Sequence, residues 1–299
     1  MMISVATRAG GLALPSLLLA GLVALIGFQT GVVTVPTFSP AIAGPQTVSI
    51  AGRSFDYRAS GEFLRGGAAV DGPLVRVAQP QPLDIMKFEV SAAEYAQCVA
   101  DGACKQAEPR RRGTGNLPAT GVSFDDAEQY AAWLSRRTGE VWRLPTVEEW
   151  AFAAGSKAVD HALGVETDPA NPAQRWLLSY AKESALAEAG PAAPMPLGTF
   201  GENEFGVTDL SAVVWEWTST CASRTTLDER GNTLSHVDNC GVRYLEGRHR
   251  TPMSAFVNDA LGGGCSVGAP PDNLGFRLVR DVHWTQRIAR TMLAWLHLA

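Results

Sequence analysis

The feature that most constrains this chain is a long stretch without a single charged residue, from Ala9 to Gly52. Its most apolar part, residues 11–35, is long enough as a helix to cross a hydrocarbon layer of about 30 Å. Arg8 and the amino terminus place positive charge before it, on the side that normally stays inside. We therefore interpret residues 1–35 as one N-terminal transmembrane helix, a signal anchor, and expect the remainder to be exported.

A cleaved signal peptide is the alternative to an anchor. Ala41-Ile42-Ala43 is typical of a signal-peptidase site, although it lies well beyond the most apolar residues. Cleavage near Ala43 would release the protein from the membrane. Under either interpretation the rest of the chain functions outside the cytoplasm.

The patterns after the apolar segment predict three further parts. Residues 36–58 are rich in Pro, Gly and Ser and are predicted to be a linker, and residues 59–281 have ordinary globular composition. Residues 282–299 are predicted to form an amphipathic C-terminal helix. Its apolar stripe consists of Trp284, Ile288, Met292, Trp295 and Leu296. The helix either lies on a membrane surface or a partner, or packs on its own domain.

The formal net charge of −5 argues against a nucleic-acid partner, which requires a basic surface. The five cysteines have a different meaning in an exported protein than in the cytosol. Cys98 and Cys104 flank a turn at Gly102, and Cys221 and Cys240 bracket a polar, turn-rich stretch, so each pair is predicted to form a disulfide. Cys265 is left over, as a reactive thiol, a metal ligand or a buried inert residue.

Three helix starts share one capping pattern, in which a Ser or Thr is followed three residues later by an acidic residue. The pairs are Ser91 with Glu94, Ser123 with Asp126, and Thr146 with Glu149. The second predicted helix ends at Gly139 and the third at Gly155. A fourth helix is predicted within residues 172–190, whereas residues 222–275 show little periodicity and are expected to be mostly irregular. Strand-like runs near residues 61–67, 83–90 and 275–281 make the fold class α+β.

Taken in order, four segments resemble the formylglycine-generating enzyme (sulfatase-modifying factor) family. They are "LDIMKFEVSAAEYAQCV", "PATGVSFDDAEQYAAWLSRRTGEVWRLPTVEEWAFAA", "NEFGVTDLSAVVWEWT" and "DNLGFRLVRD". The resemblance implies a C-type-lectin-like α+β fold with little regular secondary structure. "EGRHRTPMSAF" and "GAPPDNLGFRLVRD" are most similar to exported members encoded beside copper nitrite reductases in denitrifying bacteria.

Glu216 lies between Trp215 and Trp217 and has two possible roles. On a strand the two tryptophans fall on one side and Glu216 on the other, so the glutamate is either a buried carboxylate paired with an arginine or backbone amides, or part of a calcium site. The resemblance implies calcium, held partly by an asparagine in this segment. Ala212 and Val213 stand where the family has Gly-Asn, so Glu216 is at most a remnant of that site.

The chemistry departs further from the family. The resemblance implies copper held by two cysteine thiolates about twenty residues before "GFR", but Arg250 and Ala255 fall roughly at those positions. Cu(I) needs soft ligands, so formylglycine generation by that route is not expected. The three-histidine iron site of the sulfoxide-synthase relatives is also unsupported, because the five histidines are scattered singly.

What remains is a modified pocket where the family has its active site. Arg248, His249 and Cys265 are its candidate catalytic residues, and Glu246, Arg250 and Met253 its candidate ligand-binding residues. Such a charged segment can bind an anion or polar ligand. The alternative is a solvated loop whose arginines pair with the excess acidic residues.

Two functions follow. One is an accessory protein that assists maturation of a periplasmic metalloenzyme, with copper nitrite reductase as the expected partner and the inner membrane as the anchor point. The other is a metal- or thiol-dependent oxidoreductase acting on a periplasmic substrate, with calcium or copper as the candidate cofactors. True formylglycine generation ranks third.

Overall fold

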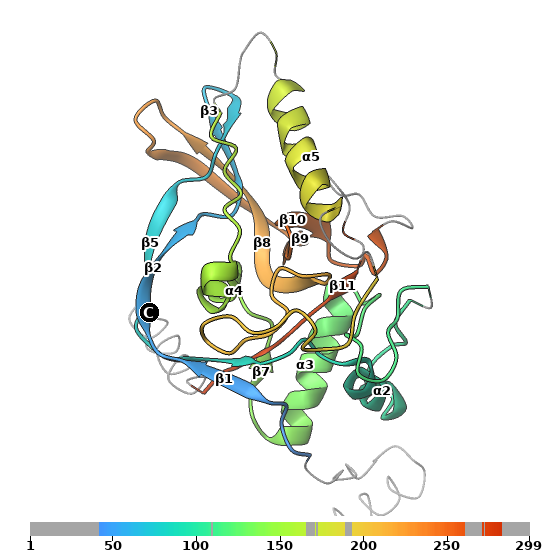
Figure 1. Ribbon diagram of the computed structural model, residues 1–299. Coiled ribbons are helices and arrows are strands. Elements are labelled where there is room, and N and C mark those ends of the chain that lie inside the picture. The colour runs from blue at the N-terminus through green and yellow to red at the C-terminus, as the bar shows by residue number, and fades with distance from the viewer. Residues whose placement is uncertain are drawn as a thin grey trace, which may run out of the picture. The chain divides into compact units, whose positions relative to one another are not determined.

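The computed structural model describes residues 42–108, 110–165, 171, 173–188, 193–260, 271 and 273–282 (Figure 1). These residues belong to one compact unit, which begins at Ile42. The predicted anchor, Cys265 and the predicted C-terminal helix beyond Val282 lie outside the described residues. Within the described part, every helix is too short or too polar to cross a lipid bilayer.

Three helices begin at the predicted capping residues. They are α2 (Ala92–Ala100), α3 (Phe124–Thr138) and α4 (Val147–Ala154). In each, the hydroxyl of the N-cap accepts a hydrogen bond from the backbone N–H of the third helical residue, while that residue's carboxylate accepts one from the N-cap N–H. Helix α3 ends at Gly139 in the left-handed conformation. Local sequence therefore fixes where these helices lie in the chain.

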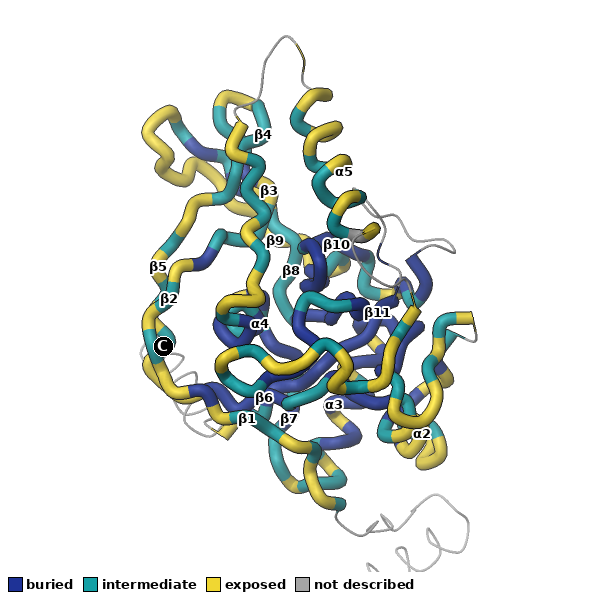
Figure 2. Tube along the Cα trace, in the orientation of Figure 1, coloured by how far each residue is buried: buried dark blue, intermediate teal, exposed yellow. Residues whose placement is uncertain are grey.

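Two more helical segments follow α4. A 3-10 helix, η1 (Gly155–Lys157), continues directly from it, and α5 (Ala173–Glu188) matches the predicted fourth helix. Arg175 pairs with Asp71, and the Lys182 ammonium donates to the carbonyls of Asp160 and Ala162, so one side of α5 is held to the body. The other side stays exposed (Figure 2).

A four-stranded sheet joins distant parts of the chain. Its order is β1 (Thr47–Ile50), β6 (Leu83–Met86), β12 (Val279–Arg280) and β7 (Trp142–Arg143). All neighbouring strands are antiparallel. The sheet therefore pairs the beginning of the folded unit with the last strand that the structure describes.

The predicted linker is too long at its carboxyl end. Within residues 36–58 the structure forms β1 and also β2 (Arg53–Arg58), which pairs with β5 (Leu74–Gln79) in a separate two-stranded sheet. Ile50 and Tyr57 are buried in the core. The prediction went wrong because Pro, Gly and Ser composition describes residues 36–46 only, whereas later residues gain their pairing partners from far along the chain.

The largest sheet carries the site region. Its order is β10 (Thr251–Ser254), β9 (Thr233–Glu246), β8 (Trp215–Leu227), β3 (Glu62–Arg65) and β4 (Ala68–Val70), and β11 (Leu274–Gly275) adds to β8 in parallel. Strands β8 and β9 form a long antiparallel hairpin that projects from the body (Figure 1).

This hairpin corrects the expectation of irregular chain after residue 222. The turn between the strands is closed by Asp228, whose carboxylate accepts hydrogen bonds from the N–H groups of Arg230 and Asn232. Residues 215–227 contain many β-branched and aromatic side chains, which favour strands. These residues, and the turn residues after them, could have indicated a hairpin. The strand was missed because residues 215–227 do not alternate between apolar and polar side chains.

The main core lies between α3, the first residues of β8, and the segment around β11. Tyr130, Trp215, Trp217 and Phe276 are all at most 1% exposed there. Figure 2 shows burial concentrated around this junction and exposure along the far end of the hairpin. The result is a mixed α+β fold in which the two aromatic side chains of the Trp-Glu-Trp motif anchor the body.

Candidate functional site

Glu216 is a buried structural carboxylate. Both of its oxygens accept hydrogen bonds from Arg277, Oε2 from Nε at 2.5 Å and Oε1 from Nη2 at 2.8 Å. The indole N–H of Trp150 also donates to Oε2, at 3.0 Å. This is the first of the two predicted roles, a carboxylate paired with an arginine. The donors around Glu216 are cationic or N–H groups, so its oxygens do not fit a calcium ion, which requires free oxygen ligands.

Arg277 is completely buried and serves two carboxylates. Besides Glu216 it lies 3.5 Å from Glu89, and it donates to the carbonyls of Thr208 and Lys87. Burial lowers the pKa of Arg277, but the charges of Glu216 and Glu89 outweigh that effect and raise it. Burial raises the pKa of Glu89 to about 8, against the opposing influence of Arg277. One guanidinium is thus shared by two buried glutamates, and the pKa of Glu89 lies above its ordinary value.

The predicted ligand-binding segment is also buried. Glu246 is 2% exposed, and its carboxylate accepts a hydrogen bond from Arg250 Nε at 2.5 Å. His161 approaches the same carboxylate, with Nε2 3.7 Å from Oε2. Burial raises the pKa of Glu246, but Arg250 and His161 outweigh it and bring the pKa below its ordinary value. The alternative of a solvated loop is therefore wrong for this segment.

Arg250 ties the segment to β2. Its guanidinium donates to the carbonyl of Arg58 at 3.1 Å and lies 5.3 Å from the centre of the Tyr57 ring. These contacts fill the space around Glu246 with protein groups. The sequence prediction grouped Glu246 and Arg250 as candidate ligand-binding residues and did not include Tyr57 and His161, because neither belongs to a motif and both come from distant segments.

Two further predicted residues, Arg248 and His249, pack on Trp215. His249 is 1% exposed with its ring edge-on to the indole, and the backbone carbonyl of His249 accepts a hydrogen bond from the indole N–H at 3.1 Å. Arg248 donates to the carbonyl of Ala212 at 2.5 Å and its guanidinium lies 5.9 Å from the same indole ring. Met253 is fully buried in the main core. Substitutions here would therefore disturb packing as well as any site.

The structure places the two predicted regions on neighbouring strands. Glu216 and Glu246 are opposite each other on β8 and β9. Each carboxylate is paired with its own arginine, Arg277 and Arg250 respectively. The sequence analysis treated Glu216 as architectural and Glu246 as part of a pocket. In the structure both glutamates belong to ion pairs, and these lie on adjacent strands.

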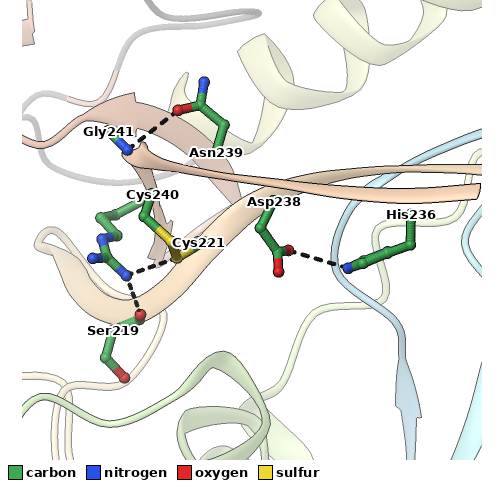
Figure 3. The surroundings of a disulfide bond; sticks show 8 residues. Ser219, Cys221, His236, Asp238, Asn239, Cys240 and Gly241 are labelled. Carbon is green, nitrogen blue, oxygen red and sulfur yellow. Dashed lines mark hydrogen bonds and ion pairs between the residues drawn. A yellow bond between two sulfur atoms is a disulfide. The ribbon is translucent and has the colours of Figure 1, made fainter.

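The groups present do not match a copper–thiolate centre. Around Arg250 they are a guanidinium, a carboxylate, an imidazole and a phenol ring, whereas Cu(I) requires soft sulfur ligands. All four cysteines in the described residues are paired, in the predicted Cys98–Cys104 and Cys221–Cys240 disulfides. The first closes the turn after α2 and the second joins β8 to β9 (Figure 3). Cys265 lies outside the described residues.

A separate pocket lies beside α2, with a volume of about 340 Å³. It is lined by Ala92, Tyr95, Ala96, Val99, Ala100, Gln106, Ala107, Arg112, Gly113, Ala119 and Thr120. None of the predicted site residues contributes to it. Small side chains on one side of α2 were the available signal, but alanines on a helix more often indicate close packing than a pocket.

Comparison with known proteins agrees with the fold. The chain is 34% identical over 170 residues to the inactive C-alpha-formylglycine-generating enzyme 2 of Bos taurus, covering 53% of each chain. It is 30% identical over 183 residues to the formylglycine-generating enzyme of Streptomyces coelicolor, covering 58% of this chain and 55% of that protein. The alignments thus span about half the length of these relatives.

A solved structure, PvdO from Pseudomonas aeruginosa, has the same fold at 21% identity. The superposition has a TM-score of 0.50 and covers 79% of this chain and 94% of PvdO. The family model of the sulfatase-modifying factor enzyme 1-like domain matches residues 34–282, which include every described strand and helix. This chain therefore belongs to the sulfatase-modifying factor, or formylglycine-generating-enzyme-like, domain family.

Proposed function

We propose that this chain is an exported, non-catalytic member of its family that assists maturation or function of a periplasmic metalloenzyme. The Glu246–Arg250 ion pair is the observation that carries this proposal. It lies where the family resemblance places the first copper thiolate, and it is buried between β9 and β2. An ion pair enclosed by Tyr57 and His161 replaces the oxidising centre of the family at this position. The fold is then available for binding a partner.

Two further observations support a binding role. A relative that aligns over about half of this chain is itself named an inactive formylglycine-generating enzyme, so the family includes a member named as inactive. The two disulfides are compatible with export to an oxidising compartment. The similarity of residues 246–256 and 268–281 to nitrite-reductase-associated members makes copper nitrite reductase the partner of choice.

A reporter peptide tests the absence of formylglycine chemistry. We expect no aldehyde when the purified chain is incubated with a peptide carrying a sulfatase-type cysteine motif and Cu(I), because the described residues supply no free thiolate. A formylglycine-generating enzyme run in parallel verifies the assay. Aldehyde formed by this chain would contradict the proposal, and loss of that aldehyde in Cys265→Ser would point to the oxidoreductase alternative.

The accessory role is tested in a denitrifying host. Deleting the gene for this chain should lower the copper content and activity of the nitrite reductase while its protein level is maintained, and the wild-type gene should restore both. A host in which copper loading is unchanged by the deletion would refute the nitrite reductase as the partner. Glu229→Gln, a change at an exposed residue of the hairpin turn, serves as the complementing control.

A further inference from the structure

The outer edge of β9 is open at the far end of the hairpin. Strand β10 covers only the stretch from Val242 to Leu245, and the last contact on that side is the hydrogen bond from the Ala255 N–H to the Gly241 carbonyl. From Thr233 to Cys240, β9 pairs with β8 on one side and with no other described strand on the other. Residues 233–241 are exposed along their whole length.

An open edge has a defined chemistry. It presents backbone N–H and C=O groups whose natural partner is another extended strand. Proteins usually block such edges with lysine, proline or a bulge, but residues 233–241 contain neither lysine nor proline. The pairing with β8 is regular from Ser235 to Asn239, since the register shifts lie outside this run. Over these five residues the strand is regularly paired with β8 and its other edge carries no lysine or proline.

The same five residues are complementary to themselves. In an antiparallel pairing centred on Val237, each Val237 faces its copy, and His236 of one chain faces Asp238 of the other. Val237 is an exposed apolar side chain, with 65% of its surface accessible to solvent. Within one chain His236 already contacts Asp238, Nε2 to Oδ1 at 3.1 Å (Figure 3). Two-fold pairing would place two such histidines and two such aspartates in one cross-strand group.

Several contacts hold β9 in an extended conformation suited to strand pairing. The Cys221–Cys240 disulfide links β8 to β9 at the base of the hairpin (Figure 3). Arg243 donates hydrogen bonds to the Ser219 carbonyl and to the Cys221 sulfur. The Thr225 hydroxyl is hydrogen-bonded to His236 Nδ1 at 2.8 Å, which orients the imidazole. A strand held in this way loses little further conformational entropy on pairing.

We infer that β9 is a dimerisation edge, on which a second copy of this chain adds its own β9 antiparallel about Val237. The two hairpins then form one continuous sheet, with two His236–Asp238 cross-strand pairs on either side of the central valines. A single strand pair buries less surface than the roughly 1,000 Å² expected of a stable interface. The dimer is therefore reversible, and it is favoured where the chain is concentrated.

Cysteine cross-linking of the full chain tests both the contact and its register. Across a two-fold axis at residue 237 the two Cβ atoms lie about 5 Å apart, so Val237→Cys should give a covalent dimer on mild oxidation, in a Cys265→Ser background. Ser235→Cys is the matched control on the same strand. It faces position 239 of the other copy, and its own copy lies about 13 Å away, so it should remain monomeric.

The charge pairs give an independent test. His236→Asp should reduce the Val237→Cys cross-linking yield, because like charges then face each other. The dissociation constant of the dimer should rise by about tenfold. Adding Asp238→His should restore both values. The inference is overturned if Ser235→Cys cross-links as well as Val237→Cys, if the charge exchange fails to restore the dimer, or if Val237→Cys stays monomeric.

Discussion

At the scale of single residues, the protein is organised around two buried arginines. Arg277 and Arg250 each neutralise a glutamate on β8 or β9, and each donates to backbone carbonyls from other segments. Because an unpaired charge in such a place is far more costly than an unpaired charge at the surface, the members of each pair depend on one another. The charged residues that the sequence motifs suggested as functional are thus part of buried ion pairs that stabilise the fold.

Glu216→Gln tests this dependence. Removing the carboxylate leaves the fully buried Arg277 with Glu89 alone, and we expect a loss of unfolding free energy on the order of 3 kcal/mol. For a domain of this size that corresponds to a drop in melting temperature on the order of 10 °C. The control is Glu62→Gln, which breaks the exposed pair with Arg224 and should change stability by at most about 1 kcal/mol. Equal melting temperatures for the two variants would contradict the structural role of Glu216.

The raised pKa of Glu89 makes the stability of the fold depend on pH. Its pKa is raised from 4.5 to about 8 by burial, so the folded protein keeps a proton that the unfolded chain releases. Its stabilising contribution is present below pH 4.5 and is lost as the pH rises to about 8. Glu89→Gln should therefore weaken the decline in stability over this range. Denaturant unfolding of both proteins at several pH values measures the difference, and parallel curves would show that Glu89 does not retain its proton.

At the scale of elements, the positions of the short helices are set by local capping residues, whereas those of the short strands depend on pairing with distant segments. The capping boxes of α2, α3 and α4 are local, so they could be located from residues three apart. The strands of the four-stranded sheet are two to four residues long. Strands β6 and β12 lie within the strand-like runs predicted near residues 83–90 and 275–281, whereas β1 and β7 were not predicted. The two disulfides lie outside this sheet, one after α2 and one between β8 and β9.

The Cys98–Cys104 disulfide is expected to stabilise the turn after α2. Replacing both cysteines with alanine should lower the unfolding free energy by on the order of 2 kcal/mol, since the bond closes a short loop. Peptide mapping without reduction should recover the two residues in one linked fragment. If both thiols react freely with an alkylating reagent in the native protein, the bond does not form in solution.

At the scale of the whole molecule, the folded unit begins at Ile42, shortly after a segment long and apolar enough to cross a bilayer. We expect the chain to stay in the membrane fraction after alkaline carbonate extraction, with the folded unit accessible to protease from the periplasmic side. Recovery of a soluble fragment that starts at Gly44 would instead establish a cleaved signal. A variant with three arginines in place of Leu18, Leu19 and Ala20 is the control, and it should abolish export.

The sequence by itself determined the family, the three capped helices, the fourth helix and both disulfides, because each depends on residues close in the chain or on quoted motifs. It also limited Glu216 to a buried, paired carboxylate or a remnant of a calcium site, because Ala212 and Val213 stand where the family has Gly-Asn. Only the tertiary structure decided that Arg277 is its partner, that His161 and Tyr57 close around Glu246 and Arg250, and that β9 has an open edge. These outcomes depend on pairings between segments many residues apart, for which local patterns carry no register. Arg250 lies only four residues after Glu246, whereas Arg277 is 61 residues from its partner Glu216, so closeness in the sequence is a guide to the first ion pair and not to the second.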